Sequence, residues 1–137
     1  MTKTPNPGIG LDFETVLMVT ADTTGSPLIN DFGVVWAGVA RQAAHVFDQD
    51  VYFGATAKAA ALLDQLLRHP WLEHHQVRAA WAATEASLAV NGYRIRAEVP
   101  MKEIASLLGR IIGPGVDLAE LAAVLRSWCE SDPISIG

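Results

Sequence analysis

The stretch H-P-W-L-E-H-H-Q-V-R-A-A-W-A-A-T-E-A-S-L-A-V-N-G-Y, from His69 to Tyr93, decides the fold. It begins with a polar loop that contains three histidines and one glutamate, and continues into a segment with almost no charge. Between Ala79 and Val90 the only ionisable residue is Glu85. Since a helix that is apolar on all sides is typical of a protein interior, we predict a buried central helix with a polar loop at its N-terminus.

Five other segments show apolar residues at helical spacing. The expected helices cover residues 12–22, 31–46, 56–68, 101–112 and 118–129. Pro70 should end the third of these, because the residue before a proline is pushed out of the helical region. The segment Phe47–Thr56 is rich in aromatic and β-branched residues and is expected to be extended. No set of strands can make a sheet, so we predict an all-α fold, a compact bundle of about six helices.

Positions within the helical stripes give more specific expectations. Thr56 is expected to cap the third helix, with Lys58, Asp64 and Arg68 on its outer side. Gly38 interrupts the second stripe and predicts close packing between helices. Large aromatic residues in the stripes are expected to belong to the core. They are Trp36, Trp81 and Trp128.

Length and composition indicate one domain. The 137 residues are half hydrophobic, without low-complexity segments, so the chain is long enough to bury a substantial core. Residues 1–10 contain two prolines and two glycines and predict a flexible N-terminal arm. Residues 11–130 form the predicted helical domain, and residues 131–137 a C-terminal tail.

Charge and cysteine content exclude several classes of protein. The net charge of −5 is spread without a basic block, so no direct nucleic-acid binding is expected. No apolar run approaches the roughly 18–20 residues that a membrane span needs, and no signal-peptide core is present. The single cysteine, Cys129, fits a reducing cytoplasm, and its simplest interpretation is a small hydrophobic residue rather than a reactive thiol.

The loop residues suggest phosphate chemistry. A neutral histidine such as His69 can take a proton from a hydroxyl group, and the carboxylate of Glu73 can hold Mg²⁺ bound to a nucleotide. Arg78, near the start of the helix, can pair with a phosphate. Helix N-termini attract anions through free N–H groups and the helix dipole. The spacing therefore suggests a phosphoryl- or nucleotidyl-transfer site.

Two other interpretations of the loop remain open. His69, Glu73, His74 and His75 can be read as ligands of a transition metal, since imidazoles and a carboxylate suit zinc. Alternatively, Glu73 simply stabilises the dipole of the following helix and His69 is a hydrogen-bonded loop residue.

The sequence resembles the signature of the Fic/Doc family. That signature reads H-P-F-x-[D/E]-G-N-[K/G]-R-T-A, followed by an alanine-rich helix and N-G-Y; this chain has H-P-W-L-E, then R-A-A-W-A-A-T and L-A-V-N-G-Y-R-I. The likeness extends upstream through D-Q-D-V-Y and A-K-A-A-A-L-L, and covers about four-fifths of the chain.

The resemblance implies an all-helical fold and a transferase. Active members move AMP or phosphate from a nucleotide with Mg²⁺ onto a hydroxyl group of a target protein, and many are toxins held by an antitoxin. It implies His69 and Arg78 as catalytic residues, His75 and Arg78 as residues that bind ATP or another nucleotide, and Glu73 as the metal ligand. Trp71 corresponds to a buried aromatic, while Tyr52 and Phe53 lie where relatives form a flap for the target peptide.

The signature is degenerate in this chain. Four residues, from His74 to Val77, separate Glu73 from Arg78, where the family has three. The small residue and the asparagine of the family have no clear counterpart. A phosphate cradle needs positive φ, which glycine adopts freely and other residues adopt at a cost of about 1 kcal/mol. We therefore expect impaired or absent catalysis, and keep two hypotheses: a toxin-like transferase, and an inactive module that binds a host protein or an antitoxin.

Overall fold

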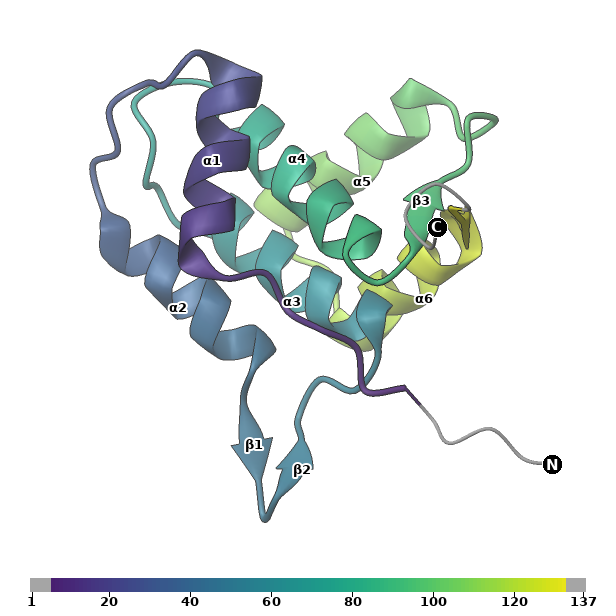
Figure 1. The fold of residues 1–137 in the computed structure, drawn as a ribbon. Coiled ribbons are helices and arrows are strands. Elements are labelled where there is room, and N and C mark those ends of the chain that lie inside the picture. The colour runs from purple at the N-terminus through teal and green to yellow at the C-terminus, as the bar shows by residue number, and fades with distance from the viewer. Residues whose placement is uncertain (1–5, 133–137) are drawn as a thin grey trace, which may run out of the picture.

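The computed structural model describes residues 6–132 as a bundle of six helices with four short strands (Figure 1). The all-α prediction is confirmed. The elements are α1 (Phe13–Thr24), α2 (Phe32–Gln42), β1 (His45–Val46), β2 (Gln49–Asp50), α3 (Ala55–Arg68), α4 (Gln76–Ala89), β3 (Tyr93–Ile95), α5 (Met101–Ile112), α6 (Leu118–Trp128) and β4 (Cys129–Ser131). None of the helices within residues 6–132 combines the length and the apolar character that crossing a membrane requires.

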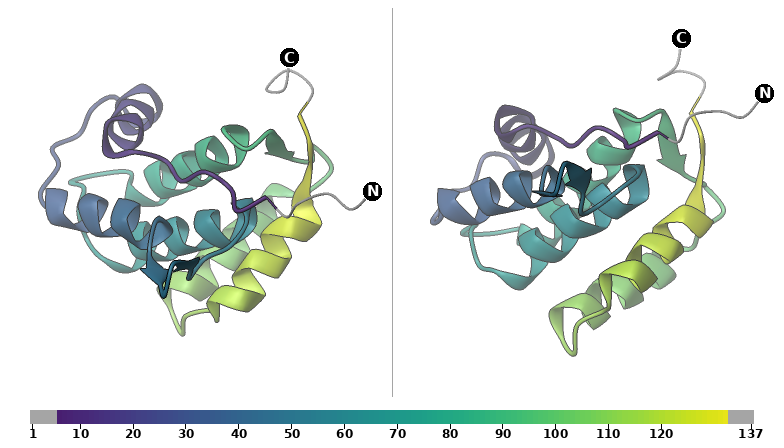
Figure 2. Two further views of the ribbon diagram at one scale, coloured as in Figure 1. Left: turned by 60° about the horizontal axis from the view of Figure 1, so that its bottom comes forward. Right: turned by 90° about the horizontal axis from the view of Figure 1, so that it is seen from below.

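The most deeply buried helix is α3. From Lys58 to Leu67 every residue except Gln65 is buried, and α3 packs against α2, α4, α5 and α6. Figure 2 shows α2 and α6 on opposite sides of it. On α2, Gly38 meets α3 closely, since a Cβ added there would lie 3.1 Å from Leu62 Cδ1. The prediction of close helix packing at Gly38 is thus confirmed.

Two antiparallel ribbons accompany the helices. In the first, β1 pairs with β2, with His45 opposite Asp50, and this hairpin projects from the bundle (Figure 1). In the second, β3 pairs with β4 and brings Ile95 opposite Cys129. The expected extended character of residues 47–56 is therefore realised in β2, at Gln49 and Asp50, whereas Phe47 and Asp48 form the turn of the hairpin with φ of 50° and 63°.

The N-terminal segment is fastened by side-chain amides. Gln42, buried on α2, donates to the Leu11 carbonyl oxygen and accepts from the Leu11 amide, both at 3.1 Å. Asn91 makes the same paired contact with Ile9, both bonds at 2.8 Å. Residues 1–5 of the predicted arm and 133–137 of the predicted tail lie outside the described residues.

Four predicted helix boundaries are corrected. Helix α1 continues through Thr23 and Thr24, instead of stopping at residue 22, and ends before Gly25, which has φ of 77°. Helix α2 ends at Gln42 rather than Val46, because His45 and Val46 pair with β2 instead. Gly54, not Thr56, precedes α3, and its φ of 99° turns the chain out of the hairpin. Helix α6 ends one residue before Cys129, which joins β4. The helix over residues 101–112 and the stop at Pro70 are as expected.

Two side chains predicted on the outer side of α3 are buried. Lys58 and Asp64 are only 5% and 8% exposed. Each has a partner of opposite charge in another element: Lys58 Nζ lies 2.9 Å from Asp50 of β2, and Asp64 lies 3.0 Å from Arg41 of α2. The helical stripe could not reveal these partners, because both come from distant parts of the chain. Arg68 is exposed, as expected.

The expected burial of Trp36 and of α4 also needs correction. Trp36 is 55% exposed, because it lies on the outer side of α2, where Phe13 of α1 stacks on one face of its ring and leaves the rest uncovered. Helix α4 is buried through Ala80, Ala83 and Leu88 but exposed at Arg78 and Glu85. Although α4 has few charges, it is not buried on every side, because one side of it borders an open cavity.

Candidate functional site

The loop between α3 and α4 is held by main-chain bonds to the segment that links α1 to α2. The Asn30 amide donates to the Trp71 carbonyl oxygen at 2.8 Å, and the Glu73 amide donates to the Leu28 carbonyl oxygen at 2.9 Å. Trp71 is completely buried, as the prediction required, and its indole N–H donates to the Leu66 carbonyl oxygen. This pairing gives the loop a defined path although it contains no regular secondary structure.

Gln76, the first residue of α4, holds the loop in place through hydrogen bonds from its side chain to the main chain. Its side-chain oxygen accepts from the amides of Trp71 and Leu72 at 3.0 and 3.4 Å. Its side-chain nitrogen donates to the carbonyl oxygens of Leu66 and His69 at 3.1 and 2.8 Å. A single side chain therefore joins the end of α3, the loop and the start of α4. Sequence reasoning missed this residue, since nothing in a lone glutamine indicates such partners.

The N-terminus of α4 is suited to an anion. The first amides of a helix have no partner within it and carry the positive end of the helix dipole. His75 precedes α4 with φ of 63°, in the left-handed region, and its side chain does not cap the helix. The residue before α4 thus has the positive φ that glycine adopts easily, although in this chain that residue is a histidine.

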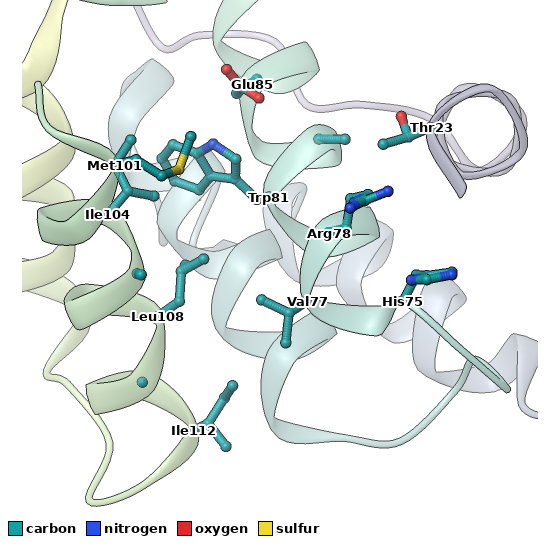
Figure 3. A pocket seen from close by; sticks show the side chains of 13 residues that line it. Thr23, His75, Val77, Arg78, Trp81, Glu85, Met101, Ile104, Leu108 and Ile112 are labelled. Atoms are coloured by element: carbon teal, nitrogen blue, oxygen red, sulfur yellow. The ribbon is translucent and has the colours of Figure 1, made fainter. Parts of the chain in front are cut away.

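A cavity of about 710 Å³ opens beside this N-terminus, between α4 and α5 (Figure 3). His75 and Arg78 lie at one end of it, and Glu85 lies further along α4. Apolar side chains from both helices make up most of the wall. They include Val77, Trp81, Met101, Ile104, Leu108 and Ile112. The cavity has the size and mixed lining of small-molecule sites.

The two charges of the cavity differ in their surroundings. Arg78 is exposed and has no ion-pair partner within residues 6–132, so its guanidinium is available to an anion. Glu85 lies against the apolar wall, and this partial removal from water raises the pKa of its carboxyl group. One end of the cavity therefore favours negative charge, and the middle disfavours it.

The predicted site residues fall into two groups. His75 and Arg78 line the cavity together, whereas His69 and Glu73 are exposed and outside its wall. One Glu73 oxygen accepts from the Leu28 amide at 3.3 Å, and the other lies 3.7 Å from His74 Nε2. No hydrogen bond or ion pair within the described residues joins His69 to Glu73. The predicted roles of all four remain predictions.

The zinc interpretation of the loop is not supported. No three His, Cys, Asp or Glu side chains within residues 6–132 are grouped so that they can hold a metal ion by themselves. His74 and His75 have ring centroids 6.3 Å apart and planes inclined by 61°. Mg²⁺ bound to a nucleotide makes a smaller demand on the protein, because one or two carboxylates and the phosphates suffice.

Tyr52 and Phe53 follow the hairpin, where a flap was expected. Tyr52 is half-buried, with the Arg41 guanidinium 5.7 Å from its ring centroid and 3.4 Å from its hydroxyl oxygen. Phe53 is 52% exposed, and Phe47 at the hairpin tip is 94% exposed. Tyr52 thus contributes to the structure, while the tip presents apolar surface to solvent.

Comparison with known proteins finds one informative similarity. The chain is 35% identical over 119 residues to the protein called Toxin Doc of Mycolicibacterium smegmatis (strain ATCC 700084 / mc(2)155). The matched region covers 86% of this chain and 92% of that protein. No family model and no solved structure matches the chain.

Proposed function

The chain belongs to the family of the Doc toxins, and from this premise we propose that it transfers AMP or a phosphoryl group from a nucleotide to a hydroxyl group of a target protein. The observation that carries the proposal is the position of Arg78 and His75, which line one cavity at the N-terminus of α4. Free amides, a helix dipole and an unpaired guanidinium converge there, as phosphate binding requires.

The residues at the loop fit a nucleotide with Mg²⁺. The left-handed backbone at His75 supplies the conformation of a phosphate cradle without a glycine. Glu73 has used one acceptor site on the Leu28 amide, and a carboxylate has about four, so it retains the capacity to bind Mg²⁺. When bound, the nucleotide supplies the transferred group and Mg²⁺ neutralises phosphate charge.

The roles of the side chains follow from their chemistry. Arg78 binds a phosphate group and holds it at the start of α4. His69, exposed at the end of α3, accepts the proton of the target hydroxyl group, which makes the oxygen a better nucleophile. His75 contributes a ring nitrogen to the nucleotide. The extra loop residue and the bulk of His74 and His75 make this catalysis weaker than a glycine loop would allow.

A second candidate is an inactive module that binds a host protein or an antitoxin. It is favoured by the separation of His69 and Glu73 from the cavity wall and by the largely apolar lining. In both cases we propose an antitoxin as a partner. We also propose cytoplasmic action, consistent with a single cysteine, and no direct contact with nucleic acid.

Thermal unfolding with nucleotides and Mg²⁺ separates the two candidates. A nucleotide at about 100 times its Kd adds about 2.7 kcal/mol to the free energy of unfolding. We expect ATP or another nucleoside triphosphate to raise the Tm of the wild-type protein. Arg78→Ala should remove most of this shift, and Arg126→Ala, at an exposed position of α6, should not. No shift with any nucleotide at millimolar concentration favours the inactive module.

Radiolabelled ATP identifies the transferred group. Label in the α-phosphate reaches the target protein only if AMP is transferred, and label in the γ-phosphate only if the phosphoryl group is transferred. Proteins of a bacterial lysate serve as acceptors. His69→Ala should abolish labelling while leaving the nucleotide-dependent Tm shift, because His69 is assigned to the proton and not to the phosphate.

A further inference from the structure

The outer face of α2 carries no polar side chain. Its exposed residues, including the C-cap, are Phe32, Gly33, Trp36, Ala37, Ala40 and Ala43. The opposite side packs on the bundle through Val35, Gly38 and Gln42. A surface helix normally has polar residues toward solvent, and a helix apolar on both sides is normally covered on both. Figures 1 and 2 show α2 at the edge of the bundle, with its outer side uncovered.

The aromatic end of this face is held in place. The Trp36 ring stacks on Phe13 of α1, with centroids 4.0 Å apart and planes inclined by 6°. Phe13 also lies 6.2 Å from the Phe32 ring. Even so, Trp36 and Phe32 remain 55% and 49% exposed. Because their orientations are fixed before any partner arrives, ordering them in an interface costs little entropy.

We propose that the outer face of α2 binds the same face of a second copy of the chain, with the two α2 helices antiparallel across a two-fold axis near Ala37. The large residues Phe32 and Trp36 occupy the N-terminal half of the face, and Ala40 and Ala43 occupy the C-terminal half. In an antiparallel pair Phe32 of each copy lies over Ala40 and Ala43 of the other, and the two Trp36 rings meet beside the axis, because Trp36 is only one residue from Ala37. Ala37 at the crossing allows close approach of the two helices.

The charges at the two ends of α2 fit the same arrangement. Asp31 is exposed at the N-terminal end. Arg41 lies near the C-terminal end, where it pairs with Asp64 at 3.0 Å and keeps 29% of its side chain exposed. An antiparallel pair brings Asp31 of each copy near Arg41 of the other and opposes the two helix dipoles. A parallel pair would instead place Asp31 against Asp31. The face is therefore complementary to itself in both size and charge.

The oligomeric state of the full chain tests the proposal. Sedimentation velocity over a range of micromolar concentrations should show a species of twice the 14.7 kDa chain mass. Ala37→Arg should leave only monomer, because it places two like charges at the crossing. Since Ala37 is exposed, the variant should keep the wild-type circular dichroism spectrum. Ala123→Arg, on the exposed side of α6, is the matched control and should remain dimeric.

Cross-linking tests the register. With Cys129→Ser as background, Ala37→Cys should form an intermolecular disulfide rapidly under mild oxidation. Ala40→Cys should not, because three residues from the axis on each helix separate the two thiols by about 9 Å along the helices. Disulfides need Cα atoms within about 7 Å. Equal cross-linking of both variants would contradict the antiparallel pairing.

Replacement of Asp31 tests the charge complementarity. Asp31→Asn keeps an N-cap oxygen for the Gly33 amide but removes the charge, and should raise the dimer Kd by about 2–10-fold at low salt. The effect should shrink in high salt. The proposal is wrong if the wild-type chain is monomeric at every concentration, including the case in which Trp36 binds only a different protein. It is also wrong if Ala37→Arg stays dimeric.

Discussion

The side-chain nitrogen of Gln76 donates to the main-chain carbonyl oxygen of His69 across 2.8 Å. This bond joins the residue proposed as the proton acceptor to the first residue of α4. Together with the bonds to Leu66, Trp71 and Leu72, it determines where the loop lies relative to the helix N-terminus. The loop of this protein is thus organised by the side chain of the first residue of α4.

Replacing Gln76 by alanine should destabilise the protein. Four hydrogen bonds are lost, and at about 0.5–1.5 kcal/mol each the free energy of unfolding should fall by roughly 2–6 kcal/mol. Urea denaturation followed by circular dichroism measures the change. Gln49→Ala, at an exposed position of β2, should change stability by less than about 0.5 kcal/mol. Equal effects of both replacements would show that the Gln76 contacts contribute little.

Replacing Lys58 by methionine should loosen the hairpin. Lys58 Nζ lies 2.9 Å from Asp50 Oδ2 and 2.5 Å from the Tyr52 carbonyl oxygen, so it fastens the end of β2 and the segment that follows it to α3. Without it, amide hydrogen exchange over residues 45–52 should accelerate, and the Tm should fall by several degrees. The control is Lys102→Met at an exposed position of α5, which should leave both unchanged.

The Lys58 effect should depend on pH. The hydrogen bond from Lys58 lowers the pKa of Asp50 below its usual 3.8. A lowered carboxyl pKa contributes stability above the unfolded value, and this contribution is lost as pH falls through the folded value. The Tm difference between wild type and Lys58→Met should therefore narrow in acid below pH 3.8. If the Tm difference between the two proteins stays constant down to that pH, the ion pair between Lys58 and Asp50 does not cause it.

Replacing Glu85 by glutamine should stabilise the protein slightly at neutral pH. Partial removal from water raises the pKa of Glu85 above its ordinary 4.5, so folding makes the carboxylate less favourable than it is in the unfolded chain. The resulting penalty is absent below the unfolded value and develops as pH rises through the folded value. Glu85→Gln should thus have a higher Tm than wild type at pH 7 and an equal one below 4.5. A higher wild-type Tm at pH 7 would indicate a favourable partner for the carboxylate.

Cys129 should react slowly in the folded protein. Burial raises the pKa of its thiol from 9.0 to about 11, so the thiolate fraction near neutral pH is about 100-fold lower than in the unfolded chain. Alkylation by iodoacetamide should be slower by at least that factor, and urea should restore the rate. Fast labelling without denaturant would mean that β4 opens readily.

Much of the helical framework could be predicted from the sequence, because the signals that start and stop helices are local. Pro70 ends α3, and Asp12 and Asp31 cap α1 and α2 by accepting amides of the first turn. Asp117 likewise accepts the Glu120 amide at 3.4 Å. Family membership could be recognised for the same reason, since its signature lies in one continuous stretch that includes Trp71.

Only the tertiary structure decided what lies opposite each helix. Lys58 and Asp64 are buried because Asp50 and Arg41 reach them from other elements. Trp36 is 55% exposed because it lies on the outer face of α2, where Phe13 stacks on one face of its ring only. The tertiary structure also placed Arg78 on the cavity wall and His69 outside it. Helical hydrogen bonds join residues four apart, so periodicity in the sequence reports them; packing joins residues distant in the chain, and periodicity on one helix does not identify its neighbour.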